Sequence, residues 1–376
     1  MIFYITVRQC RPVGCSALLQ LSKYFTRHAL LLAVALLLGS GTAGATQLRG
    51  LYEATAPLDQ TKTRARDMAF ADAMEQVLVR VTGRRDVAAD PGVSELLAKP
   101  GAYAVQFRET VDGELWVAFD RKAVNEVLSA ARLPIWGGER PSVLMLVAMD
   151  LGGGERYVLA SEDDVPDPRR LELREEIEDQ SNRRGLPVVL PLMDVQDRSV
   201  LSFTDVWGGF DQVLLEAAQR YDVDTVLLGR FRYDEPDRMR WTLLEGEQAE
   251  PERWVGRFED GIGGAADRLA ARYAVATDAA LEGEIGLAVT GIADYADFRR
   301  VVRFLEGLTA IERVSVRGLD GEEVIFGLTL RGSLDNVDQA IRLGGLLQAD
   351  PAGSPGEPGA GGDAERRVAL AYRLGP

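Results

Sequence analysis

The pattern of apolar positions within residues 59–86 predicts one long amphipathic helix. Apolar side chains recur there at intervals of three and four residues, namely Phe70, Met74, Val77, Leu78 and Val81. Asp59 or Thr61 can cap the start, and Gly83 suits a left-handed end. Because a helix with one apolar stripe must cover another element, we expect this helix to lie on a small sheet.

Alternating apolar positions on both sides of this helix predict that sheet. The segments 48–58, 103–111 and 114–120 have the period of strands, and Asp112-Gly113 is a hairpin turn signal. A short helix starting at Asp90-Pro91 and a second amphipathic helix over residues 121–132 complete the pattern. We therefore predict a small α+β domain over residues 46–132.

The following nine residues, 133–141, are rich in Gly and Pro and are predicted to be a linker. Residues 142–149 then form a nearly continuous apolar run, which is typical of a central strand covered on both faces. After this run, helical and strand patterns alternate. Three consecutive strands then follow. This order predicts a three-layer α/β domain with a mixed sheet over residues 142–283. Its expected helices cover 168–184, 210–221 and 261–282, and its further strands cover 186–192, 225–233, 239–245 and 253–258.

The C-terminal part has the order βαββαβ, which is that of a ferredoxin-like domain over residues 284–376. We expect strands at 287–290, 311–316, 324–330 and 368–372, and helices beginning at Asp294 and Leu334. Residues 349–364 are polar and rich in Gly and Pro, so we expect a disordered insertion there.

Residues 1–45 have the features of a signal peptide. A region with Arg and Lys but no acid precedes the apolar run 29–39, and small residues place a cleavage site at Ala43 and Ala45. The apolar run is short for a bilayer span, although an uncleaved anchor is the alternative. Because the basic region is long, the true start codon could also lie downstream of Met1. We predict a periplasmic or otherwise exported protein that meets the membrane only transiently, through this peptide.

The charge of the chain argues against nucleic acid as a partner. Lys and Arg number 43 against 58 Asp and Glu, for a net charge of −15. Removing residues 1–45 takes away four positive charges and no acid, which gives −15 − 4 = −19. An acidic surface repels phosphate backbones and anionic lipid.

The processed chain has neither cysteine nor histidine, because Cys10, Cys15 and His28 all lie in the signal peptide. Thiolate nucleophiles, a Ser-His-Asp triad and the usual zinc and copper sites are therefore excluded. Carboxylate chemistry, a Ser-Lys pair or a cation held by oxygen ligands remain. We expect no cofactor and no metal.

Three groups of residues are candidates for binding. Glu162, Asp163, Asp164 and Asp167 could hold Ca²⁺, but their spacing is not that of an EF-hand and favours a solvated loop. Arg84 and Arg85 could bind an anionic ligand or could complement the helix C-terminus, which we favour. Trp136 and Trp207, each followed by two glycines, could anchor a partner or pack inside the protein. We take Trp136, Trp207, Arg84 and Arg85 together as the candidate interaction surface, with no catalytic residue.

Three phrases of the sequence resemble a bacterial family known as domain-of-unknown-function family 2066. They are VLVRVTGRRDV (77–87), LPIWGGERPSVLMLVA (133–148) and VDTVLLGRF (223–231). The resemblance covers most of residues 47–275 and implies a secreted or envelope protein, without assigned catalytic residues.

These patterns favour a non-catalytic envelope protein that binds or scaffolds other proteins. The alternative is a carboxylate-based hydrolase acting on an envelope glycan, which needs two carboxylates that face one cleft. A sensor of a small ligand or of Ca²⁺ is a third hypothesis.

Overall fold

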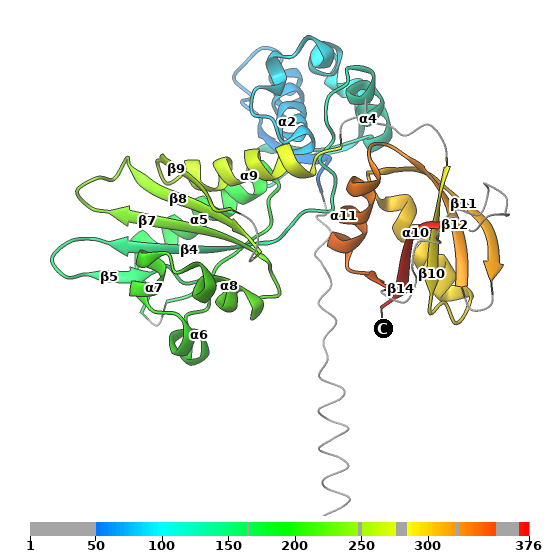
Figure 1. Cartoon of the computed structure of the whole chain (residues 1–376). Helices are drawn as coiled ribbons and strands as arrows, with labels where there is room; N and C mark the ends of the chain where they lie inside the picture. Colours follow the sequence, from blue (N-terminus) through cyan, green and yellow to red (C-terminus); the bar gives the residue numbers. More distant parts are fainter. Residues whose placement is uncertain are drawn as a thin grey trace, which may run out of the picture. The chain divides into compact units, whose positions relative to one another are not determined.

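The structure is a computed structural model that describes residues 50–163, 165–246, 250–275, 284–320, 323–350 and 368–375. Three sheets with their helices make up this part of the chain, which confirms the predicted mixture of α+β and α/β architecture (Figure 1). Within these ranges, none of the helices combines the length and apolar character needed to span a bilayer. The predicted signal peptide, with Ala43 and Ala45, lies outside the described residues.

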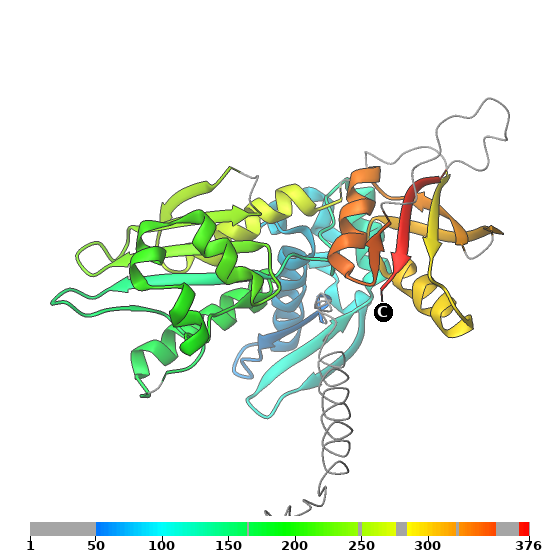
Figure 2. The ribbon, with the colours of Figure 1, turned by 60° about the horizontal axis from the view of Figure 1, so that its bottom comes forward.

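The first sheet has three antiparallel strands in the order β1-β3-β2. Figure 2 shows the β2–β3 hairpin in cyan beside the blue helix α2. The apolar stripe predicted for this helix is buried against the sheet, so the expected packing is confirmed. The elements are β1 (Glu53–Pro57), α2 (Ala65–Thr82), α3 (Ser94–Ala98), β2 (Ala104–Glu109), β3 (Glu114–Phe119) and α4 (Arg121–Ala130), with single 3-10 turns at Val87–Ala89, Pro91–Val93 and Pro100–Tyr103.

The start of helix α2 differs from the prediction. Asp59 does not cap the helix, because its side chain accepts hydrogen bonds from the backbone N–H and the hydroxyl of Thr61, at 3.1 and 2.6 Å. The helix begins at Ala65 after Arg64, which has a left-handed backbone and makes no capping bond. A local turn therefore competes with the helix for the capping side chain, as Asp and Thr commonly allow.

Strand β2 is more exposed than its alternating pattern suggests. It lies at the edge of the sheet, with β3 as its one partner strand in the part of the chain that the structure describes. Val105 and Phe107 are both exposed, although the Phe107 ring meets Phe70 of α2 edge-on with centroids 5.4 Å apart. Helix α2 is centred on β1 and β3, so it covers the edge strand only in part.

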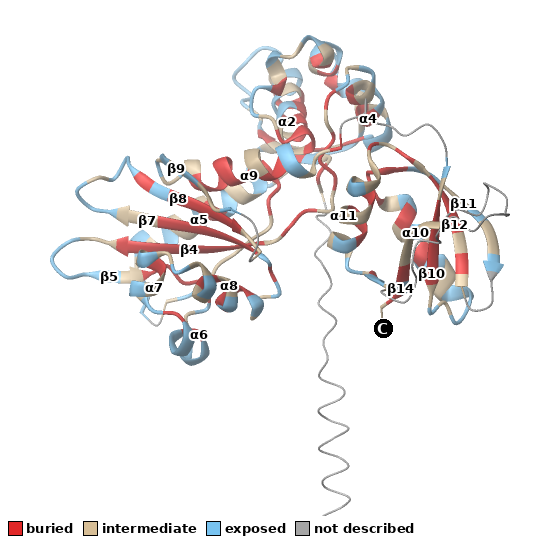
Figure 3. Cartoon of the chain, in the orientation of Figure 1, coloured by how far each residue is buried: buried red, intermediate tan, exposed pale blue. Residues whose placement is uncertain are grey.

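The second sheet has helices on both faces, as predicted for a three-layer domain. The strand order is β5-β4-β7-β8-β9, and β6 also pairs with β4. Odd-numbered side chains of β4 pack with α5 and α9, whereas the even-numbered ones pack with α7 and α8. Figure 3 shows β4 buried along its length, as its continuous apolar run predicts. The elements are β4 (Val143–Asp150), β5 (Arg156–Val158), α5 (Pro168–Arg184), β6 (Val188–Val189), α6 (Val195–Val200), α7 (Phe203–Gly208), α8 (Asp211–Gln219), β7 (Thr225–Arg232), β8 (Met239–Glu245), β9 (Glu252–Gly256) and α9 (Asp260–Tyr273).

Helices α6 and α7 were not expected from the sequence. Each is six residues long, which is too short to produce a recognisable apolar period. Their caps were nevertheless visible, since Asp194 starts α6 and Ser202 with Asp205 forms a capping box at α7. Helix α9 ends at Tyr273, and most of the remaining range expected to be helical, residues 276–282, lies outside the described residues.

The third sheet follows the order βαββα of a ferredoxin-like unit and then adds one strand. The strand order is β11-β12-β10-β14-β13. The additional strand β13 reverses the chain, so β14 runs parallel to β10. The predicted insertion lies almost entirely in residues 351–367, which are not described. The elements are β10 (Glu284–Thr290), α10 (Tyr295–Gly307), β11 (Ile311–Asp320), β12 (Glu323–Leu330), α11 (Leu334–Gly344), β13 (Leu347–Ala349) and β14 (Val368–Leu374).

Gly83 ends α2 where that helix meets α9, as the sequence predicts for the helix end. Its φ is +72°, in the left-handed region that favours glycine. A Cβ atom at this position would lie 2.2 Å from the Cβ of Ala270 on α9. Both the turn and the close packing of the two helices therefore depend on the missing side chain.

Replacing Gly83 with alanine should lower the free energy of unfolding by roughly 2–4 kcal/mol, from left-handed strain and the clash with Ala270. Gly113→Ala is the matched control, because Gly113 has φ +78° and no atom within 4 Å of an added Cβ. This control should lower the free energy of unfolding by roughly 1–2 kcal/mol, because it introduces left-handed strain without a clash. Urea unfolding of both variants measures the difference, and equal losses would contradict the importance of the helix contact.

Candidate functional site

The segment from Leu133 to Arg140, which we call the junction segment, is packed between helices of the first and second sheets. The backbones of Ile135 and Val275 exchange two hydrogen bonds, at 3.0 and 2.9 Å. The N–H of Trp136 donates to the carbonyl of Val81 at 2.7 Å, and the Trp136 side chain is 1% exposed. Gly and Pro suggested a linker here, whereas the apolar residues between them are buried as in a core.

Arg140 is the polar centre of the junction segment and is 3% exposed. Its guanidinium has five N–H donors, and the structure provides five carbonyl acceptors for them. Nε donates to Gly137 at 2.7 Å. Nη1 donates to Arg184 and Gly185 at 3.1 and 2.7 Å, and Nη2 donates to Arg80 and Trp136 at 2.8 and 2.7 Å.

These carbonyl groups explain why a charge can be buried without a carboxylate in contact. Arg80 lies in the last turn of α2, while Arg184 and Gly185 end α5. The last carbonyls of a helix have no partner within the helix and carry partial negative charge. The guanidinium also lies 3.9 Å from the ring centroid of Trp136. Burial lowers the pKa of Arg140 to about 9, so the group stays positive at neutral pH.

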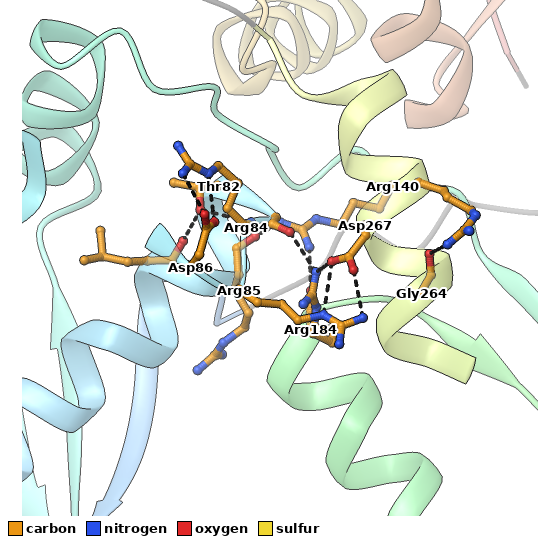
Figure 4. Close-up of polar contacts among 12 residues, drawn as sticks. Thr82, Arg84, Arg85, Asp86, Arg140, Arg184, Gly264 and Asp267 are labelled. Atoms are coloured by element: carbon orange, nitrogen blue, oxygen red, sulfur yellow. Dashed lines mark hydrogen bonds and ion pairs between the residues drawn. The ribbon is translucent and has the colours of Figure 1, made fainter. Parts of the chain in front are cut away.

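A second arginine pair completes the junction around Asp267 of α9. Arg184 donates from Nη2 to Asp267 and to the carbonyl of Gly83, both at 2.7 Å. Arg85 reaches the other oxygen of the same carboxylate at 2.7 Å. Figure 4 shows Arg85 and Arg184 converging on Asp267. One carboxylate thus connects the end of α2, the end of α5 and the middle of α9.

The structure places Arg84 and Arg85, two of the predicted site residues, in ion pairs. Arg84 makes two contacts of 3.1 Å with Asp86 and one of 3.2 Å with Asp90, whereas Arg85 binds Asp267 (Figure 4). The expected role at the carbonyl end of the helix belongs to Arg140, which the sequence analysis did not single out. Its signal was a lone arginine between a Trp-Gly-Gly motif and a buried strand.

The two Trp-Gly-Gly motifs lie in different surroundings. Trp136 is buried beside Arg140, so it offers no surface in this structure. Trp207 is half-buried on α7, on the other face of the central sheet, and stacks on Phe203 with ring centroids 5.4 Å apart. The four predicted site residues therefore do not form one surface.

The acidic loop before α5 borders a groove of about 810 Å³. Asp163 is the most buried carboxylate there, with 4% of its side chain exposed. Its two oxygens accept hydrogen bonds from Arg170 and Arg174, both at 2.9 Å. Burial alone would raise the pKa of Asp163, but these hydrogen bonds outweigh it and lower the pKa below the usual value. Within the described residues, no group of three or more acidic, His or Cys side chains is placed to hold a metal ion.

Replacing Arg140 with methionine should lower the free energy of unfolding by roughly 3–5 kcal/mol, because buried carbonyls of α2 and α5 lose their donor. Arg183→Met is the control, since Arg183 is exposed one residue before Arg184, and it should change stability by no more than about 0.5 kcal/mol. Urea unfolding followed by tryptophan fluorescence compares them. Similar midpoints for both variants would contradict a structural role for Arg140.

Asp163 should make the protein sensitive to acid. Its folded pKa is lowered, so its ion pairs stabilise the fold above its unfolded pKa of about 3.9 and are lost as the pH falls through the folded value. Asp163→Asn should therefore be less stable than the original chain at pH 7, with a difference that narrows below about pH 4. Unfolding midpoints at pH 7, 5, 4 and 3 test this. Asp179→Asn, on the exposed side of α5, should show no such convergence.

Comparison with known proteins identifies one family for part of the chain. Residues 45–137 match the model of a family described as Domain of unknown function (DUF8605), a range that contains the first sheet, its helices and the start of the junction segment. The resemblance to family 2066 is therefore wrong, because the family model that matches this chain is a different one. No curated protein and no solved structure matches the chain. The segment 45–137 is thus similar to a family whose function is itself undefined.

Proposed function

We propose that the protein is an exported, non-catalytic protein that binds or scaffolds other proteins. The observation that carries the proposal is that two nearly inaccessible carboxylates, Asp163 and Asp197, are held in ion pairs. Asp163 binds Arg170 and Arg174, and Asp197 binds Arg220 and Tyr221. These acids stabilise loops and helix ends, so they are not free to exchange protons with a substrate.

The electrostatics of Asp163 also weigh against the glycan hydrolase. Such an enzyme needs one carboxyl group with a raised pKa as the acid and a second carboxylate across the cleft. In the groove at the acidic loop, the pKa of Asp163 is lowered and both its oxygens are occupied. That arrangement supports a structural role for the loop.

The surface provides features that suit protein partners. Among the described residues, β2 and β9 are edge strands, each with a partner strand on one side. Exposed apolar side chains lie on both, with Val105 and Phe107 on β2 and Val255 on β9. Sheet edges with apolar side chains are a common way to recruit an extended segment of another chain.

An exported location supports the same proposal. The basic and apolar pattern of residues 1–45 directs secretion, and a processed chain without cysteine can fold in an oxidising compartment without forming disulfides. A protein without that leader should remain inside the cell.

Cross-linking and purification of a tagged full-length chain from the cells that make it should test the function. We expect one protein in stoichiometric amounts, recovered again when the partner carries the tag, and direct binding between the two pure proteins. A chain that lacks residues 1–45 should not recover it. A monomer without a partner, or turnover of a glycan by the pure chain, would contradict the proposal.

A further inference from the structure

Three arginines lie together on the face of the central sheet that carries α7 and α8. Arg230 on β7 is directly opposite Arg240 on β8. On β9, Arg253 is opposite Thr242, which lies two residues from Arg240 and therefore on the same face. We call Arg230, Arg240 and Arg253 the arginine face.

The helices on this side leave two of the three arginines, Arg240 and Arg253, open to solvent. Helices α7 and α8 pack on β4 and β7 (Figure 1). Beyond them, Arg240 and Arg253 are exposed, and Val255 beside them on β9 is 57% exposed. This part of the sheet is therefore accessible to another molecule.

The arginine face is a concentration of positive charge that no ion pair neutralises among the described residues. Across those residues, none of its three guanidiniums makes an ion pair or a hydrogen bond, and Nε of Arg230 is buried without an acceptor. Burial lowers the pKa of Arg230, and the charges of Arg240 and Arg253 lower it further, against a smaller opposing effect of the Asp211 carboxylate. Like charges on opposite cross-strand positions repel. In a chain with a net charge of −15, a cluster of unpaired arginines points to an anionic group from outside.

The second Trp-Gly-Gly motif is part of the same surface. A Cβ atom at Gly209 would lie 2.2 Å from Nη2 of Arg230, and Gly209 has φ +67°. Glycine therefore lets the turn after α7 close over the guanidinium. Phe210 follows directly and is 53% exposed, with its ring against Gly208. The motif places an exposed aromatic ring next to the positive charge.

We propose that the arginine face binds an acidic peptide segment of a partner protein, an inference that rests on the proposed binding function. Aspartate or glutamate side chains of the segment pair with the guanidiniums, which match the planar geometry of carboxylates. Apolar side chains of the same segment pack on Phe210 and Val255. β9 contributes its free edge, since its outer backbone groups have no partner strand in the described residues.

These features favour a peptide over a polymer or surface that carries phosphates. Only an extended peptide can use the hydrogen-bonding edge of β9. A long nucleic acid or a membrane would extend past the arginine face and meet the acidic remainder of the chain. Repulsion acts over a Debye length of about 8 Å at physiological salt, so a short segment that stays on the face avoids most of it.

Binding of fluorescent twelve-residue peptides to the full chain, measured by anisotropy, tests the proposal. A peptide that alternates Glu with Phe should bind, its Gln counterpart should bind at least tenfold more weakly, and added salt should weaken binding. The double variant Arg240→Gln/Arg253→Gln should lose at least tenfold in affinity. Arg183→Gln/Arg299→Gln removes the same charge from exposed helix positions and should bind like the original chain.

Three results would overturn the proposal. They are no binding of the acidic peptide, equal losses in both double variants, and tighter binding of anionic vesicles or single-stranded DNA than of the peptide. Unfolding midpoints of the variants show whether each is folded. If the Arg240/Arg253 variant still recovers the cross-linked partner, this surface is wrongly assigned while the binding function stands. If no partner exists but the peptide binds, the proposed function fails instead.

Discussion

The arrangement of the first two sheets depends on one buried guanidinium. A charge withdrawn from water needs partners for all of its polar groups, and Arg140 finds five carbonyl oxygens. Three of them become available only where α2 and α5 both end. Arg140 needs the carbonyl groups at both helix ends as acceptors, and those carbonyl groups need Arg140 as a donor. The nearby Asp267 then joins α9 to the same point through Arg184.

Ion pairs elsewhere in the central domain follow a related rule. Asp163 and Asp197 are nearly inaccessible to water, and each meets at least one arginine. These two acidic side chains therefore serve the fold. The arginine face is the opposite case, with positive charge gathered on the outside and no carboxylate in contact with it among the described residues.

Periodicity allowed the elements to be predicted well where they are long and packed. The stripe from Phe70 to Val81 and the continuous run of β4 report burial directly, because side-chain spacing reflects the face that is covered. Short helices such as α6 and the reversal by β13 left no such signal. The candidate site was predicted less well. Arg85 was predicted as a site residue, but its partner Asp267 lies 182 residues further along the chain. A contact between residues so far apart leaves no local pattern in the sequence. Composition suggested a linker around Trp136 because glycine and proline also occur in buried, irregular backbone.

The family match ends at residue 137, three positions before Arg140. The matched unit therefore includes helix α2 but not the side chain that satisfies the carbonyl of Arg80 at its end. In a protein where recombination joined this unit to a different neighbour, that neighbour would have to bring its own donor, or water would have to reach the helix terminus. The sequence that follows the matched unit must therefore supply a hydrogen-bond donor for the end of helix α2.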